Sequence, residues 1–394
     1  MLQNNTKALN QVRSDSSAQI VEHLKNVCTA GAFARPVLET LGPAPRVVAT
    51  LDNADCSGAL AGIADLNPSG IAAGIAAAFK LTGAQQALLV LPEAFAGAAA
   101  AVCEAAGGLG ISVETQTDNM VDIRAHQGDA LVHLVTLAAM ADALTGEEPQ
   151  AVLCIDGGLK ALPFGQPLRA AIPAPGAKAV EINHAFYPAS VLDEPLSPRF
   201  ALGCGSVVQI GTEKCIIQSV IGQVEELRGK SCGKCTFCRE GLYQLGEMFG
   251  DMTRGRSGPS DSDLIRELCE AMPISTACTL GQRSAAPAAS ALERFGDEVA
   301  AHLRRKECPS GACKSLLTIF IDPALCQGNG DCIDVCPANC IEGRTGYISM
   351  IDEFECTKCG KCAEACSEGA VRYAQGRIPP LPERPTRVGR FRGR

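Results

Sequence analysis

Cysteine placement constrains this chain more than any other feature. The chain has 21 cysteines in 394 residues, and 15 of them lie between Cys232 and Cys366. Disulfide frameworks are typical of short secreted chains, whereas thiolate metal ligands are typical of reducing compartments. The first 20 residues are polar and lack the apolar run of a secretory leader. We therefore expect a cytoplasmic protein whose thiols are reduced and bind metal.

A cysteine motif occurs twice, with an offset of 30 residues between the copies that begin at Cys326 and Cys356. The spacing is that of the bacterial ferredoxin run C-x2-C-x2-C-x3-C, in which the last cysteine of each copy serves the other cluster. This exchange predicts one complete [4Fe–4S] cluster. Its ligands would be Cys336, Cys356, Cys359 and Cys362.

The other ferredoxin-type set is incomplete because Asn329 stands where a fourth thiolate belongs. Three outcomes remain open: a [4Fe–4S] cluster with weak or alternative ligation, a [3Fe–4S] cluster, or no cluster. Cys340 could in principle complete the set, although its counterpart in the second copy is Ala370, which is no ligand. The remaining thiolates of this set are Cys326, Cys332 and Cys366.

A separate triplet, Cys232, Cys235 and Cys238, has C-x2-C-x2-C spacing. Three thiolates on one tight loop can hold one face of a cubane, and a fourth must come from elsewhere. Cys278 lies in a turn-like segment after a predicted helix and is the candidate, whereas Cys269 lies within that helix and is expected to pack as a small apolar residue. The alternative is a zinc knuckle, although zinc sites more often use paired ligands.

A third group contains His302, Cys308 and Cys313. A C-x4-C knuckle with one histidine supplies three ligands of a tetrahedral zinc site, and Cys215 could supply the fourth. Such a site would form a hinge before the ferredoxin-type segment. The alternative is that His302 ends a helix and both cysteines are free.

Periodicity predicts the structure of the rest of the chain. Before residue 150, expected helices over 71–79 and 95–106 alternate with strands over 87–91 and 111–115, which predicts parallel strands. Short strands fit the Pro- and Gly-punctuated residues 155–205, and helices fit 216–306, with apolar helical periods over 264–272 and 291–305.

Charge and hydropathy exclude two classes of partner. The net charge of −8 argues against a dedicated nucleic-acid binder, and no apolar run reaches the roughly 20 residues that a membrane helix needs. The tail from Arg377 holds six arginines and one glutamate. We expect it to be extended and unpacked, either solvated or docked on an acidic partner.

The motifs resemble a known family. Residues 231–241, with Cys278 inside Cys-Thr-Leu-Gly-Gln, resemble the cluster motif of the NADH-binding flavoprotein subunit of respiratory NADH:quinone oxidoreductase. Residues 308–314 followed by a ferredoxin segment resemble, more particularly, the beta subunit of electron-bifurcating NAD-linked hydrogenases and transhydrogenases. Residues 202–208 resemble that family's glycine-containing strand, and 162–169 part of its β-grasp domain. The match is strong over about 200–375 and weak before 200.

The resemblance implies a fold class in five parts. They are an α/β flavin- or nucleotide-type domain (1–150), a small β-grasp-like domain (151–215), a helical [4Fe–4S] domain with the zinc hinge (216–315), a two-cluster ferredoxin-like α+β domain (316–375) and a basic Pro/Arg tail (376–394).

The family's flavin and nucleotide contacts are eroded in this chain. A glycine-rich loop that would cradle the FMN phosphate retains only Gly31 within residues 28–36. The segment against the flavin reads Asn-Ala-Asp-Cys-Ser-Gly at 53–58, without the family's two glutamates, and the nucleotide segment is reduced to 127–131. We expect no FMN and no NAD(P)H in this chain.

The resemblance therefore implies an electron-transfer subunit of a multisubunit flavin-dependent oxidoreductase, with no catalytic side chain of its own. Its partners would include a flavoprotein, a thioredoxin-like [2Fe–2S] subunit and soluble ferredoxin. The alternative is a catalytic diaphorase that passes electrons from NAD(P)H through its own FMN to its clusters. A third interpretation is a zinc scaffold with vestigial clusters.

Overall fold

The computed structural model describes residues 1–117, 121–155, 158–172, 175–198, 200, 205 and 207–392. It divides into two compact units, each described by itself below. The first comprises Met1–Gly211, Val220–Gly246 and Asp263–Arg294, and the second Thr212–Ser219, Glu247–Ser262 and Phe295–Arg394. The glycine-containing strand expected over 202–208 lies partly outside the described residues.

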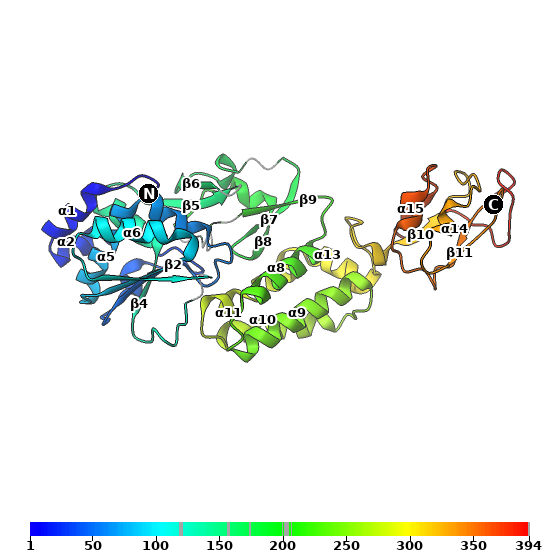
Figure 1. Cartoon of the computed structure of the whole chain (residues 1–394). Coiled ribbons are helices and arrows are strands. Elements are labelled where there is room, and N and C mark those ends of the chain that lie inside the picture. The colour runs from blue at the N-terminus through cyan, green and yellow to red at the C-terminus, as the bar shows by residue number, and fades with distance from the viewer. Residues whose placement is uncertain are drawn as a thin grey trace. The chain divides into compact units, whose positions relative to one another are not determined.

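A parallel sheet forms the centre of the amino-terminal region (Figure 1). The strand order is β3-β2-β1-β4, and every pairing is parallel. The parallel α/β arrangement predicted from the sequence is thereby confirmed. The strands are β1 (Val47–Thr50), β2 (Ala87–Pro92), β3 (Ile111–Gln116) and β4 (Ala130–His133).

Seven helices lie in the described part of this region, and the three longest of them are rich in alanine. They are α1 (Thr6–Ser14), α2 (Ser17–Leu24), α3 (Val37–Thr40), α4 (Ile63–Leu66), α5 (Pro68–Thr82), α6 (Ala96–Ala106) and α7 (Leu134–Leu144). A Cβ on Gly74 of α5 would lie 2.4 Å from the carbonyl oxygen of Leu137 in α7, so the two helices approach each other closely only because residue 74 is glycine. The expected helices 71–79 and 95–106 correspond to α5 and α6.

Short antiparallel strands follow, as the Pro and Gly punctuation predicts. One hairpin pairs β5 (Gln150–Ile155) with β6 (Gly158–Pro163). A second sheet places β7 (Ala177–Ile182) between β8 (Ala185–Pro188) and β9 (Val207–Gly211). Leu153, Val180 and Leu192 lie in the small hydrophobic core of this part.

The next segment is helical. It contains α8 (Ile216–Lys230), α9 (Thr236–Arg254), α10 (Asp261–Ile274), α11 (Thr279–Arg283), α12 (Ala286–Arg294), α13 (Gly296–Ala300) and a π-type turn over Ala301–Arg305. The helical period over 291–305 is therefore broken: Phe295 leaves helical geometry with φ −125° before a helix-weakening glycine. Among the described residues, no helix is long and apolar enough to cross a membrane.

The ferredoxin-type segment repeats its structure with its sequence. Strand β10 (Thr318–Ile321) pairs with β13 (Val371–Ala374), and β11 (Ile341–Glu342) with β12 (Met350–Ile351). The helices α14 (Asp331–Asp334) and α15 (Lys361–Ala365) begin 30 residues apart. Each follows a glycine with positive φ, Gly330 at 92° and Gly360 at 86°.

The tail packs on this segment, so the prediction of an unpacked tail is wrong. The backbone N–H of Ile348 donates to the carbonyl of Thr386 at 2.9 Å, and that of Val388 donates to Gly346 at 3.1 Å. Val388 and Phe391 pack against the core that contains the ferredoxin-type cysteines. These hydrogen bonds and the two apolar side chains hold the tail on the segment, and an interpretation based on charge alone did not consider them.

Candidate iron–sulfur and zinc centres

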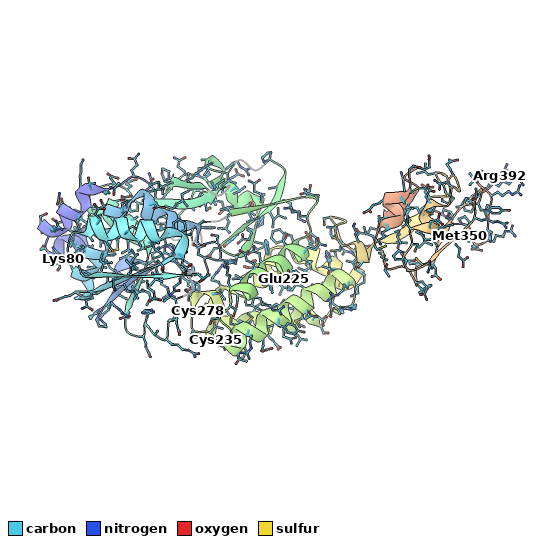
Figure 2. All side chains as sticks on the ribbon, in the orientation of Figure 1. Lys80, Glu225, Cys235, Cys278, Met350 and Arg392 are labelled. Atoms are coloured by element: carbon cyan, nitrogen blue, oxygen red, sulfur yellow. The ribbon has the colours of Figure 1, made fainter. Side chains whose placement is uncertain are left out.

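The helical triplet and Cys278 meet at one cavity. Cys232 and Cys235 precede α9, and Cys278 directly precedes α11. All three line a cavity of about 150 Å³. Figure 2 shows the labelled Cys235 and Cys278 near each other. The pKa of Cys238 is raised by burial and further by the other three thiols, which places it close to them.

Local sequence explains this arrangement. Gly233 adopts φ +73°, which lets the chain turn between the first two cysteines. The Ser231 hydroxyl lies 3.3 Å from Cys238 Sγ, and Arg239 donates to the Gly233 carbonyl at 2.8 Å. Cys269 lies apart from this role: it is buried in α10, and its thiol donates to the Ala285 carbonyl.

The second cavity collects the set predicted for the complete ferredoxin-type cluster. It is lined by five thiols, those of Cys336, Cys340, Cys356, Cys359 and Cys362. Four of these are the predicted ligands. Cys340 belongs to this group and not to the incomplete one, because its Sγ lies 3.5 Å from Cys336 Sγ and its pKa is raised by burial and by Cys336 and Cys356.

The incomplete set forms a separate group. The pKa of Cys332 is raised by burial and by the nearby thiols of Cys326 and Cys366, while a hydrogen bond with Ser349 opposes this shift. Asn329 is exposed and donates its amide N–H to the carboxylate of Asp331 at 2.8 Å. Its amide nitrogen is therefore engaged by Asp331. Completion of this set by Cys340 finds no support, because Cys340 lies with the other group.

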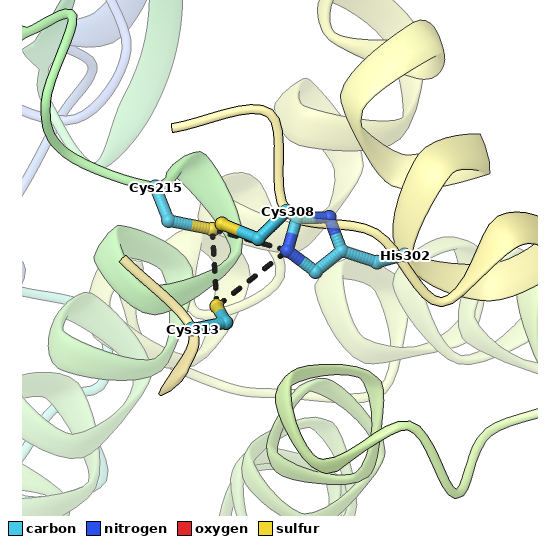
Figure 3. A group of neighbouring side chains, drawn as sticks. All are labelled: Cys215, His302, Cys308 and Cys313. Carbon is cyan, nitrogen blue, oxygen red and sulfur yellow. Dashed lines mark hydrogen bonds between the residues drawn. The ribbon is translucent and has the colours of Figure 1, made fainter. Parts of the chain in front are cut away.

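The four candidate zinc ligands come together in the second unit (Figure 3). Their ligand atoms lie within 4.8 Å of one another, and all four residues are buried. The members are Cys215, His302, Cys308 and Cys313.

The donor distances fit a tetrahedral metal. Zn–S bonds of about 2.3 Å and Zn–N bonds of about 2.0–2.1 Å place two sulfurs about 3.8 Å apart and a sulfur and a nitrogen about 3.6 Å apart. The Sγ atoms of Cys215 and Cys313 are 3.7 Å apart. His302 Nε2 lies 3.4 Å from Cys215 Sγ and 3.5 Å from Cys313 Sγ.

The other ring nitrogen of His302 completes the case for a metal-binding geometry. Nδ1 lies 2.8 Å from the carbonyl oxygen of Glu298, which can only accept, so Nδ1 carries the proton and Nε2 faces the thiols. This outer contact was not found from the sequence. An i−4 carbonyl on the same helical stretch is the signal that could have revealed it.

The pKa values of Cys215 and His302 in the absence of a metal favour binding of a cation by this group. The Cys313 thiol, by hydrogen bonding, lowers the pKa of Cys215 to about 4, despite burial. Burial lowers the pKa of His302, but the adjacent Cys215 thiolate outweighs it and raises that pKa to about 9. A buried thiolate and imidazolium would both be relieved by a divalent metal, which takes the place of the shared protons.

A further cavity, of about 370 Å³, lies where β1 and β4 end. The strand order reverses between these two neighbours, which is the usual ligand position of an open α/β sheet. Its lining includes Asp52 and His133, which were not singled out from the sequence because no local motif marks them. Among the described residues, His133 Nε2 and Thr50 Oγ1 in this lining are buried without a hydrogen-bond partner.

Comparison with known proteins identifies the two cysteine-rich segments. Residues 223–302 match the NADH-ubiquinone oxidoreductase-F iron-sulfur binding region, and residues 318–369 match the 4Fe-4S dicluster domain. The chain carries two [4Fe–4S] modules. The first extends from α8 to His302, and the second contains both copies of the repeat.

Curated relatives support the same resemblance. The chain is 36% identical over 142 residues to the HndC subunit of an NADP-reducing hydrogenase of Solidesulfovibrio fructosivorans, covering 36% of this chain and 29% of the relative. It is 32% identical over 132 residues to the F subunit of NADH-quinone oxidoreductase of Streptomyces coelicolor, covering 32% and 29%. The resemblance stated from the motifs is confirmed, although the matched part spans less than a third of each relative.

A solved structure extends the likeness to the fold. An NAD+-reducing [NiFe]-hydrogenase in the H2-reduced state is similar with a TM-score of 0.61 and 15% identity, covering 76% of this chain and 65% of that one. At this identity the likeness concerns the fold alone. It reaches beyond the segments that the sequence comparisons match.

Proposed function

We propose that this chain is an iron–sulfur electron-transfer subunit of a multisubunit, cytoplasmic, flavin-dependent oxidoreductase. The observation that carries the proposal is the presence of two [4Fe–4S] modules in one chain, with their thiols gathered at separate cavities. Bound clusters would accept and release single electrons. The chain's own residues would ligate the clusters, bury them and donate hydrogen bonds to their sulfurs.

The proposed ligands follow the groups described above. One cluster would be held by Cys232, Cys235, Cys238 and Cys278. A second would be held by Cys336, Cys356, Cys359 and Cys362. A third, of either [4Fe–4S] or [3Fe–4S] type, would be held by Cys326, Cys332 and Cys366. Zinc at Cys215, His302, Cys308 and Cys313 would be structural, because a full set of four protein ligands leaves no open position.

The flavin would lie on another subunit. The remnant of the phosphate loop fits a phosphate poorly, because two of its N–H donors, those of Ala30 and Ala32, are already used: Ala32 N–H donates to Asp52 Oδ2 at 2.7 Å. A Cβ on Gly31 would lie 2.6 Å from the same oxygen, so the Asp52 carboxylate fills the cradle. Ala30 N–H is taken by Thr136 Oγ1 at 2.8 Å. An FMN phosphate would meet a negative carboxylate where the family's loop offers free N–H groups.

The segment expected to lie against the flavin is also used internally. The Asn53 side chain exchanges two hydrogen bonds with the backbone of Val121, at 2.9 and 2.8 Å. Asp55 is buried and accepts from Ser57 Oγ and Gly58 N–H, which closes its own turn. Polar groups that could contact a cofactor thus stabilise the loop itself.

The diaphorase remains the second candidate, and one observation favours it. The cavity at the ends of β1 and β4 persists, and it retains two buried polar atoms, on Thr50 and His133, that could contact a ligand. The partners that we propose for the electron-transfer subunit are a flavoprotein, a thioredoxin-like [2Fe–2S] subunit and soluble ferredoxin.

Anaerobic purification of the native complex tests this proposal. We expect iron and sulfide for two or three clusters in this chain, and flavin only in other subunits, by mass spectrometry of separated subunits and their extracted cofactors. Stoichiometric FMN in the isolated chain would instead establish the diaphorase. A chain that carries zinc but no iron would contradict both.

A further inference from the structure

The cavity proposed for the complete ferredoxin-type cluster has one thiol too many. A [4Fe–4S] cluster takes four cysteine ligands, whereas five cysteines line this cavity. The fifth is Cys340. It is 5% exposed, and its sulfur lies 3.5 Å from that of Cys336.

The backbone places Cys340 beside Cys336 through a tight turn. Asn339 adopts φ +51°, and its N–H donates to the Cys336 carbonyl at 3.2 Å. The second copy of the repeat makes the same turn, with Gly369 at φ +59° and its N–H donating to the Cys366 carbonyl at 3.1 Å. In both copies, a turn of the same form therefore follows the last cysteine of the motif and leads to the residue four positions after it.

The two copies differ in what they place at this position. The counterpart of Cys340 is Ala370, which is 2% exposed. A methyl group is thus enough to fill this position in the core of the segment, and packing alone does not call for a sulfur atom at residue 340.

We propose that Cys340 is a reserve ligand of the complete cluster, able to take the place of Cys336. The inference rests on the proposed function, since it assumes a cluster at this cavity. In the exchange, the iron–sulfur bond to Cys336 breaks and a bond to Cys340 forms. The proton of the Cys340 thiol passes to the Cys336 sulfur along their contact, so the oxidation state of the cluster does not change.

Single and double variants of the full chain test this role. Anaerobic preparations of Cys336→Ala, Cys340→Ala, Cys336→Ala/Cys340→Ala and Cys359→Ala are compared for iron per chain and for the electron paramagnetic resonance of the reduced clusters. Cys359 is exposed and is a proposed ligand of the same cluster. Unlike Cys336, it has no spare thiol four residues after it in the sequence. The signal of the Cys232 cluster reports that the rest of the chain is intact, and circular dichroism of each variant reports the secondary structure of the whole chain.

The reserve role predicts a specific pattern. Cys336→Ala retains the wild-type iron content with altered g-values, and Cys340→Ala, which copies the other half of the repeat, retains it too. The double variant and Cys359→Ala each lose between about one and four irons per chain, because the three thiolates that remain can hold at most a [3Fe–4S] cluster securely. Equal loss from Cys336→Ala and Cys359→Ala would overturn the inference, as would retention by the double variant. Wild-type protein without iron at this cavity would overturn the cluster assignment itself.

Discussion

The parallel sheet region and the cysteine-rich segments differ in where their polar side chains find partners. Around the sheet, Asp52 accepts from the Ala32 and Ala54 backbones, and Asn53 pairs with Val121. Around His302, the ligand atoms of four buried side chains converge within 4.8 Å of one another. Under the proposed function, side chains of the first region take the place of a ligand, whereas the second region is arranged around metal atoms that the chain does not supply.

Under the proposed function, this difference explains which cofactor the chain can do without. One carboxylate can replace a phosphate because both accept N–H hydrogen bonds and carry negative charge. No side chain can replace a metal ion among thiolates, because the chain has no side chain with a divalent positive charge. A loop without flavin can therefore be stable, whereas loss of metal is expected to lower the stability of the segments that bind it.

Metal removal should produce the largest effect on stability, and it tests directly whether the two regions differ in their need for metal. After oxidative cluster removal with chelator, we expect amides of residues 318–374 to lose protection by at least about tenfold, because ligation couples to folding. Amides of β1, β2 and β4 should keep theirs. Hydrogen exchange measured by mass spectrometry distinguishes the regions, and equal loss in both would contradict the contrast.

His302→Ala should produce the next largest effect. Removing one of four ligands leaves buried thiols without their metal, so we expect zinc to fall from about one atom per chain to near zero and thermal stability to drop. His23→Ala, at a half-exposed position on α2, is the control and should retain zinc. Elemental analysis decides: iron without zinc in the intact wild type would remove the site.

Asn329→Cys sharpens the comparison within the ferredoxin-type segment. A thiolate is a softer and stronger iron ligand than an amide, so we expect a retained fourth iron and a lower reduction potential for this cluster. A redox titration followed by electron paramagnetic resonance measures both. The Asn329 amide N–H donates to Asp331, so we expect Asn329→Ala to keep the wild-type signal. Loss of this signal in Asn329→Ala would show that Asn329 is a ligand.

Asp52→Asn should have the smallest effect. It removes the negative charge from the cradle, so FMN affinity should rise, by roughly threefold to tenfold, while unfolding free energy falls by about 1–2 kcal/mol through weaker hydrogen bonds. Flavin fluorescence titration and denaturant unfolding measure the two effects. Asp65→Asn, at an exposed position, is the control. Tight FMN binding by the wild type would mean that Asp52 does not exclude phosphate.

The spacing of residues in the sequence predicted those parts of the fold that are encoded locally. The 30-residue offset foretold both halves of the ferredoxin-type segment, because ligand spacing and glycine turns are encoded within each copy. Alternating apolar segments foretold the parallel sheet. Asp52 could not be assigned its role, since its partner Ala32 is brought near only by the fold. The docked tail was missed for the same reason, as Val388 and Phe391 find their partners in a distant hairpin.

The docked tail also has a consequence for biosynthesis. Residues 386–388 leave the ribosome after every cysteine of the chain. Until they emerge, the strip 346–348 lacks its partner, and this strip covers Gly328 in the loop of the incomplete cluster through the Gly346 N–H bond to the Gly328 carbonyl. A chain that ends before residue 386 would therefore keep the strip 346–348 beside Gly328 but lose the backbone hydrogen bonds that the tail supplies to this strip.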